Sequence, residues 1–123
     1  MLEPAKTVSI FQKQSESISV AAGHIIFTAG EPGDYMYGLL EGEVELVIDG
    51  KVVETILTGD IFGEGALVQP HGTRASTAIA KTDCKLAFLD EKRFLFAIQE
   101  TPSFALQVMR SFSARLRRLK TAI

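Results

Sequence analysis

The sequence predicts a mainly β domain with flanking helices, in which a small barrel or jelly roll precedes a long C-terminal helix. Short runs of β-branched and apolar residues recur at roughly ten-residue intervals between turn residues, which is typical of barrels and jelly rolls. From Glu91 onward the apolar residues change to helical spacing. We therefore expect one domain over residues 1–123, with the barrel over about 14–90 and the helices over about 91–123.

The composition is that of one small domain. A length of 123 residues is too short for a second sizeable module, and 46% of the residues are hydrophobic. No apolar run reaches the roughly 18 residues of a membrane span. The start, Met1 to Lys6, lacks the basic and apolar stretches of a signal peptide, so we expect a cytoplasmic protein. Cys84 is the only cysteine, which rules out an intramolecular disulfide.

Four strands are predicted in the first half of the chain. Glu16 to Val20 and His24 to Thr28 are short β-rich runs, and we expect them to pair with each other. Val44 to Ile48 and Val52 to Leu57 flank Asp49-Gly50, a dipeptide that strongly favours a two-residue hairpin turn.

The second half of the chain changes from strands to helices. Ser76 to Ile79 and Cys84 to Leu89 are two further strand-like runs, divided by Lys81-Thr82-Asp83. A short helix is expected over Glu91 to Gln99, and Pro102-Ser103 opens a longer one that reaches the end of the sequence.

The last helix carries an apolar seam whose residues alternate spacings of four and three, as in a coiled coil. The seam consists of Ala105, Met109, Phe112, Leu116, Leu119 and Ile123. A second apolar pair, Phe104 and Val108, lies on its flank and is expected to pack on the barrel. We expect a homodimer through the seam. The alternative is that this short seam covers an open edge of its own domain.

Charge is unevenly distributed along the chain. Residues 1–103 carry 15 acidic and eight basic residues, whereas residues 104–123 carry five basic residues and no acidic one. Contact with nucleic acid or an acidic partner is one interpretation. The simpler one, which we favour, is a solvated helix face whose cations stabilise the C-terminal end of the helix.

The most informative segment is Phe62-Gly63-Glu64-Gly65-Ala66-Leu67, followed by Thr73-Arg74-Ala75-Ser76-Thr77-Ala78. Gly63 allows a sharp turn, and a helical turn beginning there would present free amides to an anion. Arg74 can add paired charge-assisted hydrogen bonds. Glu64 would repel that anion unless it accepts a hydrogen bond from a group attached to the phosphate, such as a ribose hydroxyl. The combination indicates a nucleotide. The alternative is a simple glycine turn with Arg74 and Glu64 as a surface ion pair.

These residues resemble the phosphate-binding cassette of the cyclic nucleotide-binding domain family, which includes the catabolite activator protein and the protein kinase A regulatory subunit. Gly30 to Tyr37 and Glu41 to Val44 resemble the two glycine-rich turns of the family and the strand that follows. The resemblance extends from about Phe11 to the last helix. It implies a jelly-roll-like double-stranded β-helix and a regulatory, non-enzymatic role in signal transduction.

The resemblance also implies a role for each residue of the cassette. Arg74 would pair with the cyclic phosphate and Glu64 would accept a hydrogen bond from the ribose 2′-hydroxyl. The rest of the shell would consist of backbone amides near Gly63, Ala66 and Ala75 and a hydrophobic floor that includes Leu67. Gly65 departs from the family, in which a larger aliphatic residue is usual here. No metal or cofactor is needed, because one arginine and the amides match the single charge of a cyclic phosphate.

Ligand preference and output are also expectations from the resemblance. Family members that prefer cGMP often have threonine directly after the arginine, so Ala75 favours cAMP, with cGMP as the second candidate and Ser76 as a minor contributor. We expect cAMP to draw the cassette toward the last helix, so that the allosteric signal is the changed helix or dimer geometry. Since the sequence stops at Ile123, without the helix-turn-helix domain of the catabolite activator, no direct DNA binding is expected.

Two rival functions remain open on the same fold, and a third, a cupin-like metal enzyme, is disfavoured. A haem or gas sensor could use Cys84 and His71 as iron ligands, as some relatives of the catabolite activator do. A partner-binding module could have lost nucleotide binding, although the presence of both Glu64 and Arg74 argues against this. A metal enzyme built on His24 and His71 has too few ligands, since these are the only histidines.

Overall fold

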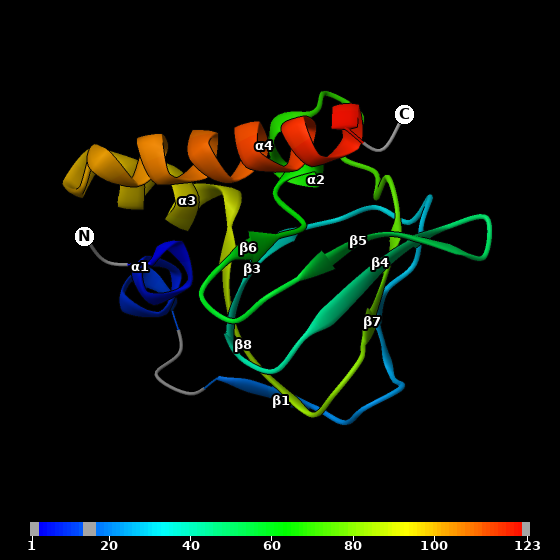
Figure 1. Cartoon of the computed structure of the whole chain (residues 1–123). Helices are drawn as coiled ribbons and strands as arrows, with labels where there is room; N and C mark the ends of the chain where they lie inside the picture. The colour runs from blue at the N-terminus through cyan, green and yellow to red at the C-terminus, as the bar shows by residue number, and fades with distance from the viewer. Residues whose placement is uncertain (1–2, 14–16, 122–123) are drawn as a thin grey trace.

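The computed structural model describes residues 3–13 and 17–121 and has eight strands and four helices in these ranges (Figure 1). The strands are β1 (Ile18–Val20), β2 (Ile25–Phe27), β3 (Tyr35–Glu41), β4 (Val44–Ile48), β5 (Lys51–Ile56), β6 (Ile61–Phe62), β7 (Thr77–Ala80) and β8 (Cys84–Asp90). The helices are α1 (Pro4–Phe11), α2 (Gly65–Val68), α3 (Glu91–Glu100) and α4 (Ser103–Thr121).

The strands form two four-stranded sheets, with the orders β1-β8-β3-β6 and β2-β7-β4-β5. Every strand pairing is antiparallel. Two packed sheets of this kind are the architecture of a jelly roll. The predicted fold class is therefore confirmed, although the strands form two separate sheets and do not close into one barrel.

The expected pairing of the first two strands is wrong. β1 pairs with β8, with Ile18 opposite Leu86, and β2 pairs with β7, with Ile25 opposite Ile79. Between them the chain crosses from one sheet to the other at Gly23, whose φ of 87° permits the sharp turn. A β-rich run shows that a strand forms but does not specify its partner. Glu16, at the start of the first expected run, lies outside the described residues.

The other predicted elements are close to their expected positions. β4 and β5 form the expected hairpin, and φ is positive at both turn residues, 51° at Asp49 and 76° at Gly50. Both values are what the favoured two-residue turn requires. β7, β8, α3 and α4 also match their predicted runs within a few residues. Ile123, the last residue of the predicted seam, lies outside the described part of the chain.

Three elements, α1, β3 and the two-residue strand β6, were not predicted from residue pattern. β3 lies between β8 and β6, and its residues 36–40 are all buried or half-buried, so it lacks the clear alternation of a half-exposed strand. α1 packs against β3 at Gly38, where an added Cβ would lie 2.8 Å from Cα of Ala5. The absence of a side chain at Gly38 therefore allows α1 to pack closely against β3.

The buried side chains form two clusters, one beneath the helices and one between the two sheets. The first includes Met36, Leu89, Phe94 and Phe104, and the second includes Leu39, Phe62 and Leu86. Phe104 and Val108 are 0% and 5% exposed, which confirms that this flank of α4 packs on the β domain. α4 therefore lies over the edge of the sheets, next to α2 (Figure 1).

Candidate functional site

The predicted cassette lies between β6 and β7, and α2 is its short helical turn. It is joined to the upstream glycine-rich turn by three backbone hydrogen bonds. Gly33 N donates to Gly72 O at 2.7 Å, and Arg74 N donates to Glu31 O at 2.8 Å. The third bond, from Gly30 N to Arg74 O, is also 2.8 Å long. The structure thus brings together the two segments that the resemblance singled out.

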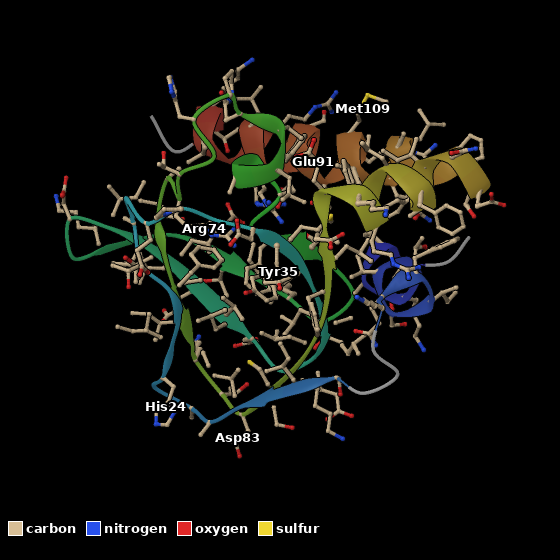
Figure 2. The ribbon with its side chains drawn as sticks, turned by 180° about the vertical axis from the view of Figure 1, so that it is seen from behind. His24, Tyr35, Arg74, Asp83, Glu91 and Met109 are labelled. Atoms are coloured by element: carbon tan, nitrogen blue, oxygen red, sulfur yellow. The ribbon has the colours of Figure 1, made fainter. Side chains whose placement is uncertain are left out.

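Arg74 is buried inside the cassette, with only 6% of its surface exposed, and it points toward the interior of the sheets (Figure 2). Its Nη1 donates to Gly63 O and its Nη2 to Tyr35 O, both at 2.7 Å. A guanidinium has five N–H donors, so these two bonds leave donors for a ligand. Burial lowers the pKa of Arg74, and the neighbouring Tyr37, Asp34 and Glu64 oppose that shift.

A cluster of aromatic rings packs against the guanidinium of Arg74. The central carbon of the guanidinium lies 4.1 Å from the ring centre of Phe27, a cation–π distance. The ring of Phe27 lies 6.0 Å from those of Tyr37 and Phe62. Burial also raises the pKa of Tyr37 above its usual value. These rings come from three separate strands, and no local sequence signal connects them to Arg74.

Glu64 is even more deeply buried, at 2% exposure. Its Oε1 accepts a hydrogen bond from Nη1 of Arg115 at 2.8 Å, whereas its Oε2 is buried and has no partner among the residues that the structure describes. The alternative of a surface ion pair between Glu64 and Arg74 is therefore wrong. The free Oε2 is an acceptor that a hydroxyl group could satisfy.

Arg115 is the residue of the candidate site that sequence reasoning missed. Its side chain is 14% exposed, and it also contacts Asp60 and donates to the carbonyl of Ile61. On the same face of α4, Ser111 donates to Asp60 at 2.6 Å and Arg118 pairs with Glu54 at 2.8 Å. The interpretation of the basic residues as a solvated face is thus wrong for Arg115. Spacings of four and three among the polar residues 111, 115 and 118 are the pattern that could have identified this face.

The other cassette residues line the same turn with different exposure. Ala66 is 7% exposed and Leu67 packs against the first core cluster. Gly65 and Ala75 are exposed and Ser76 is half-buried. No residue in the described ranges accepts a hydrogen bond from the amides of Gly65 and Ala66. The roles predicted for these residues toward a ligand stay predictions.

Gly33 provides space for Arg74. A Cβ at Gly33 would lie 2.4 Å from Nε of Arg74 and 2.6 Å from Cβ of Ala66. We expect Gly33→Ala to displace the arginine and to destabilise the fold by about 1–3 kcal/mol, a typical cost of overpacking. The control is Gly65→Ala, because a Cβ at Gly65 meets no atom within 4 Å. Urea unfolding of both variants tests this, and equal stabilities would contradict it.

The residues considered for a haem or metal site lie on different elements. Cys84 begins β8, and its thiol donates to the carbonyls of Glu43 and Thr82 at 3.3 and 3.2 Å. Burial raises the pKa of this thiol. His71 instead follows α2 and lines a cavity with Gly33. In the ranges 3–13 and 17–121, no three His, Cys, Asp or Glu side chains are grouped to hold a metal.

None of the helices in these ranges is long and apolar enough to cross a membrane.

The fold and the site together define a jelly-roll domain whose cassette buries one arginine and one glutamate. The family model of the cyclic nucleotide-binding domain matches residues 17–101. The chain therefore belongs to the cyclic nucleotide-binding domain family.

Individual relatives agree with this assignment. The chain is 32% identical over 124 residues to a CRP-like cAMP-activated global transcriptional regulator of Mycobacterium tuberculosis, with 95% of this chain and 54% of the relative covered. It is 42% identical over 81 residues to a cAMP-dependent protein kinase regulatory subunit of Schizosaccharomyces pombe, which covers 64% of this chain and 19% of that protein. The chain thus spans about half the length of the first relative and less of the second. By their names, these relatives are regulators or regulatory subunits.

Solved structures show the same fold. The catabolite activator protein of Thermus thermophilus matches with a TM-score of 0.77 and 24% identity, over 98% of this chain and 57% of that one. A cAMP-bound structure named PfPKA-R matches with a TM-score of 0.68 and 31% identity, over 85% of this chain and 37% of that one.

Proposed function

We propose that this chain is a single regulatory domain, not an enzyme, that binds a cyclic nucleotide, with cAMP as the preferred ligand. The observation that carries the proposal is the pair of buried charged groups in one cassette. Arg74 has donors to spare, and Oε2 of Glu64 is an acceptor without a described partner. A cyclic nucleotide offers an anion to the first and a ribose hydroxyl to the second. The relatives named for cAMP support the same ligand.

Each cassette residue has a place in the proposed complex. Arg74 binds the cyclic phosphate, and Glu64 accepts a hydrogen bond from the 2′-hydroxyl through Oε2. The amides of Gly65 and Ala66, at the start of α2, are oriented by the turn that begins at Gly63 and add donors to the phosphate. Leu67 contributes apolar surface. A cyclic phosphate carries one negative charge, which these groups balance without a metal.

Preference for cAMP over cGMP rests on Ala75, which has no hydroxyl to bond the guanine amino group. Ser76 is half-buried and can contribute only a minor contact. Calorimetric titration with cAMP and cGMP tests the proposed function. We expect saturable binding of cAMP and weaker binding of cGMP. Absence of binding by both nucleotides would contradict the proposal and favour a haem sensor or a partner-binding module.

The proposed signal passes from the cassette to α4. Ser111, Arg115 and Arg118 fasten this helix to Asp60, Glu64 and Glu54. Glu64 is the partner of Arg115 on α4. A nucleotide that bonds Glu64 therefore changes the ion pair that holds this helix against the cassette. A ligand shifts the position of α4 only if it binds more tightly to the domain with the helix in one position than in another. Arg115 is thus the residue through which the ligand acts on the helix.

We also propose that the chain forms a homodimer through the outer face of α4. Ser111, Arg115 and Arg118 lie on the side of this helix that contacts the β domain, whereas Met109 lies on the outer side (Figure 2). The exposed fractions are 55% for Met109, 38% for Phe112, 54% for Leu116 and 47% for Leu119. A row of apolar side chains at coiled-coil spacing fits a second copy of the same helix.

The dimer is tested by Leu116→Glu, which places a charge in the middle of the seam. We expect sedimentation to change from dimer to monomer at micromolar concentration, because two carboxylates would face each other across the symmetric contact. Ala114→Glu adds the same charge to an exposed position outside the seam and should leave the dimer intact. A wild-type protein that sediments as a monomer would contradict the proposal.

A further inference from the structure

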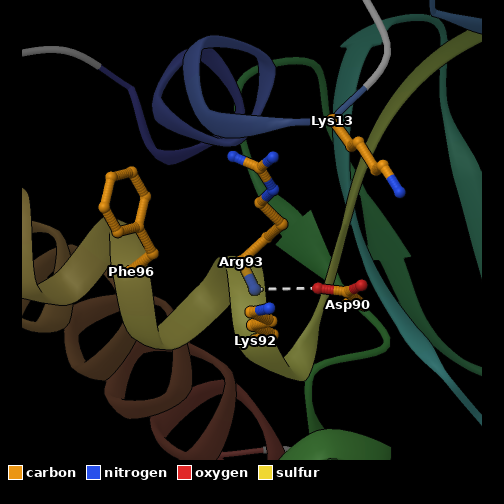
Figure 3. Close-up of a pocket in the computed structure, with 5 residues that line it drawn as sticks. All are labelled: Lys13, Asp90, Lys92, Arg93 and Phe96. Carbon is orange, nitrogen blue, oxygen red and sulfur yellow. Dashed lines mark hydrogen bonds between the residues drawn. The ribbon is translucent and has the colours of Figure 1, made fainter.

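A groove separate from the cassette lies between the end of α1, the first turn of α3 and β8 (Figure 3). One part has a volume of about 310 Å³ and is lined by Lys13, Asp90, Lys92, Arg93 and Phe96. A neighbouring part of about 360 Å³ is lined by Lys13, Tyr35, Phe88, Leu89, Asp90 and Arg93. We call these two parts, which share Lys13, Asp90 and Arg93, the cationic groove.

The groove carries more positive than negative charge. Among the described residues that line its first part, three are basic (Lys13, Lys92 and Arg93) and one is acidic (Asp90), which leaves a surplus of two positive charges there. The carboxylate of Asp90 is already engaged as the cap of α3, where it accepts from Arg93 N at 2.8 Å. No ion pair among the described residues includes any of the three cations, whereas Lys81, on the same domain, is paired with Glu43.

Among the described cations of the groove, Arg93 is the one that is partly buried, so the surplus of positive charge is least compensated by water at this residue. Its side chain extends from α3 toward α1, and the residue is only half-exposed (Figure 3). A cation that is partly removed from water without a counter-charge is unfavourable, so the site is suited to an anion. Phe96 and Tyr35 leave 43% and 41% of their surfaces exposed in the same groove. An aromatic or apolar group attached to the anion would therefore find contact surface.

We propose that the cationic groove binds a small organic phosphomonoester. Such a group carries about −1.5 to −2 charges at neutral pH, which matches the surplus of the groove. The fork of Arg93 and the ammonium groups of the lysines are donors suited to phosphate oxygens. Each of the two parts of the groove, at about 310 and 360 Å³, lies near the lower end of the ~300–1,000 Å³ that is usual for small-ligand sites. The proposal does not depend on nucleotide binding at the cassette.

The test is a titration of ¹⁵N-labelled protein with phenyl phosphate at constant ionic strength, followed by amide chemical shifts, with inorganic phosphate in parallel. We expect saturable shifts centred on Lys13 and on residues 92–96, with phenyl phosphate binding more tightly. Arg93→Gln should weaken binding about tenfold or more, since it removes a charge-assisted contact. Lys92→Gln, at an exposed position, should weaken it less. The control Lys81→Gln should leave it unchanged.

The Arg74→Ala variant separates this groove from the cassette. Phenyl phosphate binding that persists in this variant supports a second site. Shifts centred on Ala66 and Arg74, and lost in Arg74→Ala, would assign the phosphate to the cassette and overturn the proposal. Unsaturable shifts, or an equal loss in Lys81→Gln, would overturn it as well, because either result shows general charge attraction.

Discussion

Arg74→Ala is expected to reduce the affinity for cAMP about thirtyfold or more, because truncating one member of a desolvated charge pair typically costs ~2–5 kcal/mol. The arginine is 6% exposed and its guanidinium is held by the carbonyls of Gly63 and Tyr35. In the proposed complex it would therefore meet the phosphate with its orientation already fixed. Arg74→Lys should also bind poorly, because an ammonium lacks the planar fork that spans both carbonyls and the phosphate.

Calorimetric titration measures this loss after far-UV circular dichroism has shown that each variant is folded. The matched control is Arg117→Ala, which removes an equal charge from an exposed position on α4. It should bind cAMP like the wild type. An Arg74→Ala variant that is folded and retains wild-type affinity would show that the nucleotide does not contact this residue.

Arg115→Ala is expected to lower the free energy of unfolding by about 2 kcal/mol. Removing one partner of a fully buried ion pair typically costs ~3–5 kcal/mol, and partial exposure reduces that cost. Glu64 has 3% of its side chain exposed and Arg115 has 14%, so loss of the arginine leaves a nearly buried carboxylate without its charge partner. The Ser111 to Thr121 part of α4 should loosen at the same time, because it loses a contact to the cassette.

Urea unfolding of a double-mutant cycle tests this account of Arg115. Glu64→Gln together with Arg115→Ala should destabilise less than the sum of the single variants, because the two residues are coupled. Arg118→Ala is the matched control, since its ion pair with Glu54 is half-exposed at the arginine, with 52% of that side chain accessible. Its cost should stay below about 1 kcal/mol. Equal costs for Arg115 and Arg118, with additive effects in the cycle, would mean that the buried pair has no special role.

Local sequence features predicted those parts of the fold that depend on neighbouring residues. The Asp49-Gly50 turn was predictable because two consecutive positive φ angles favour this dipeptide. The α3 helix was predictable from its spacing, and Asp90 caps it as a good N-terminal residue does. The partners of β1 and β2 were not predictable, because both lie far along the chain, in β8 and β7.

The candidate site was also only partly predictable. Glu64 and Arg74 stand in one short segment whose chemistry suggests an anion with a hydroxyl donor, and the structure buries both. Arg115 stands 51 positions from Glu64, and its sequence neighbours suggested only a basic helix face. The stacking of Arg74 on Phe27 likewise depends on the meeting of distant strands. Contacts of this kind follow from the tertiary fold and leave no local pattern.

Hydrogen exchange of the wild-type protein with and without saturating cAMP tests the central claim most directly, because it locates the ligand and its effect on α4 together. We predict slower exchange of the cassette amides over residues 63–67 and 74–76, and changed exchange in the Ser111 to Thr121 part of α4. Unchanged exchange in the cassette would contradict nucleotide binding there. Protection of the cassette with an unchanged α4 would contradict the coupling through Glu64 and Arg115.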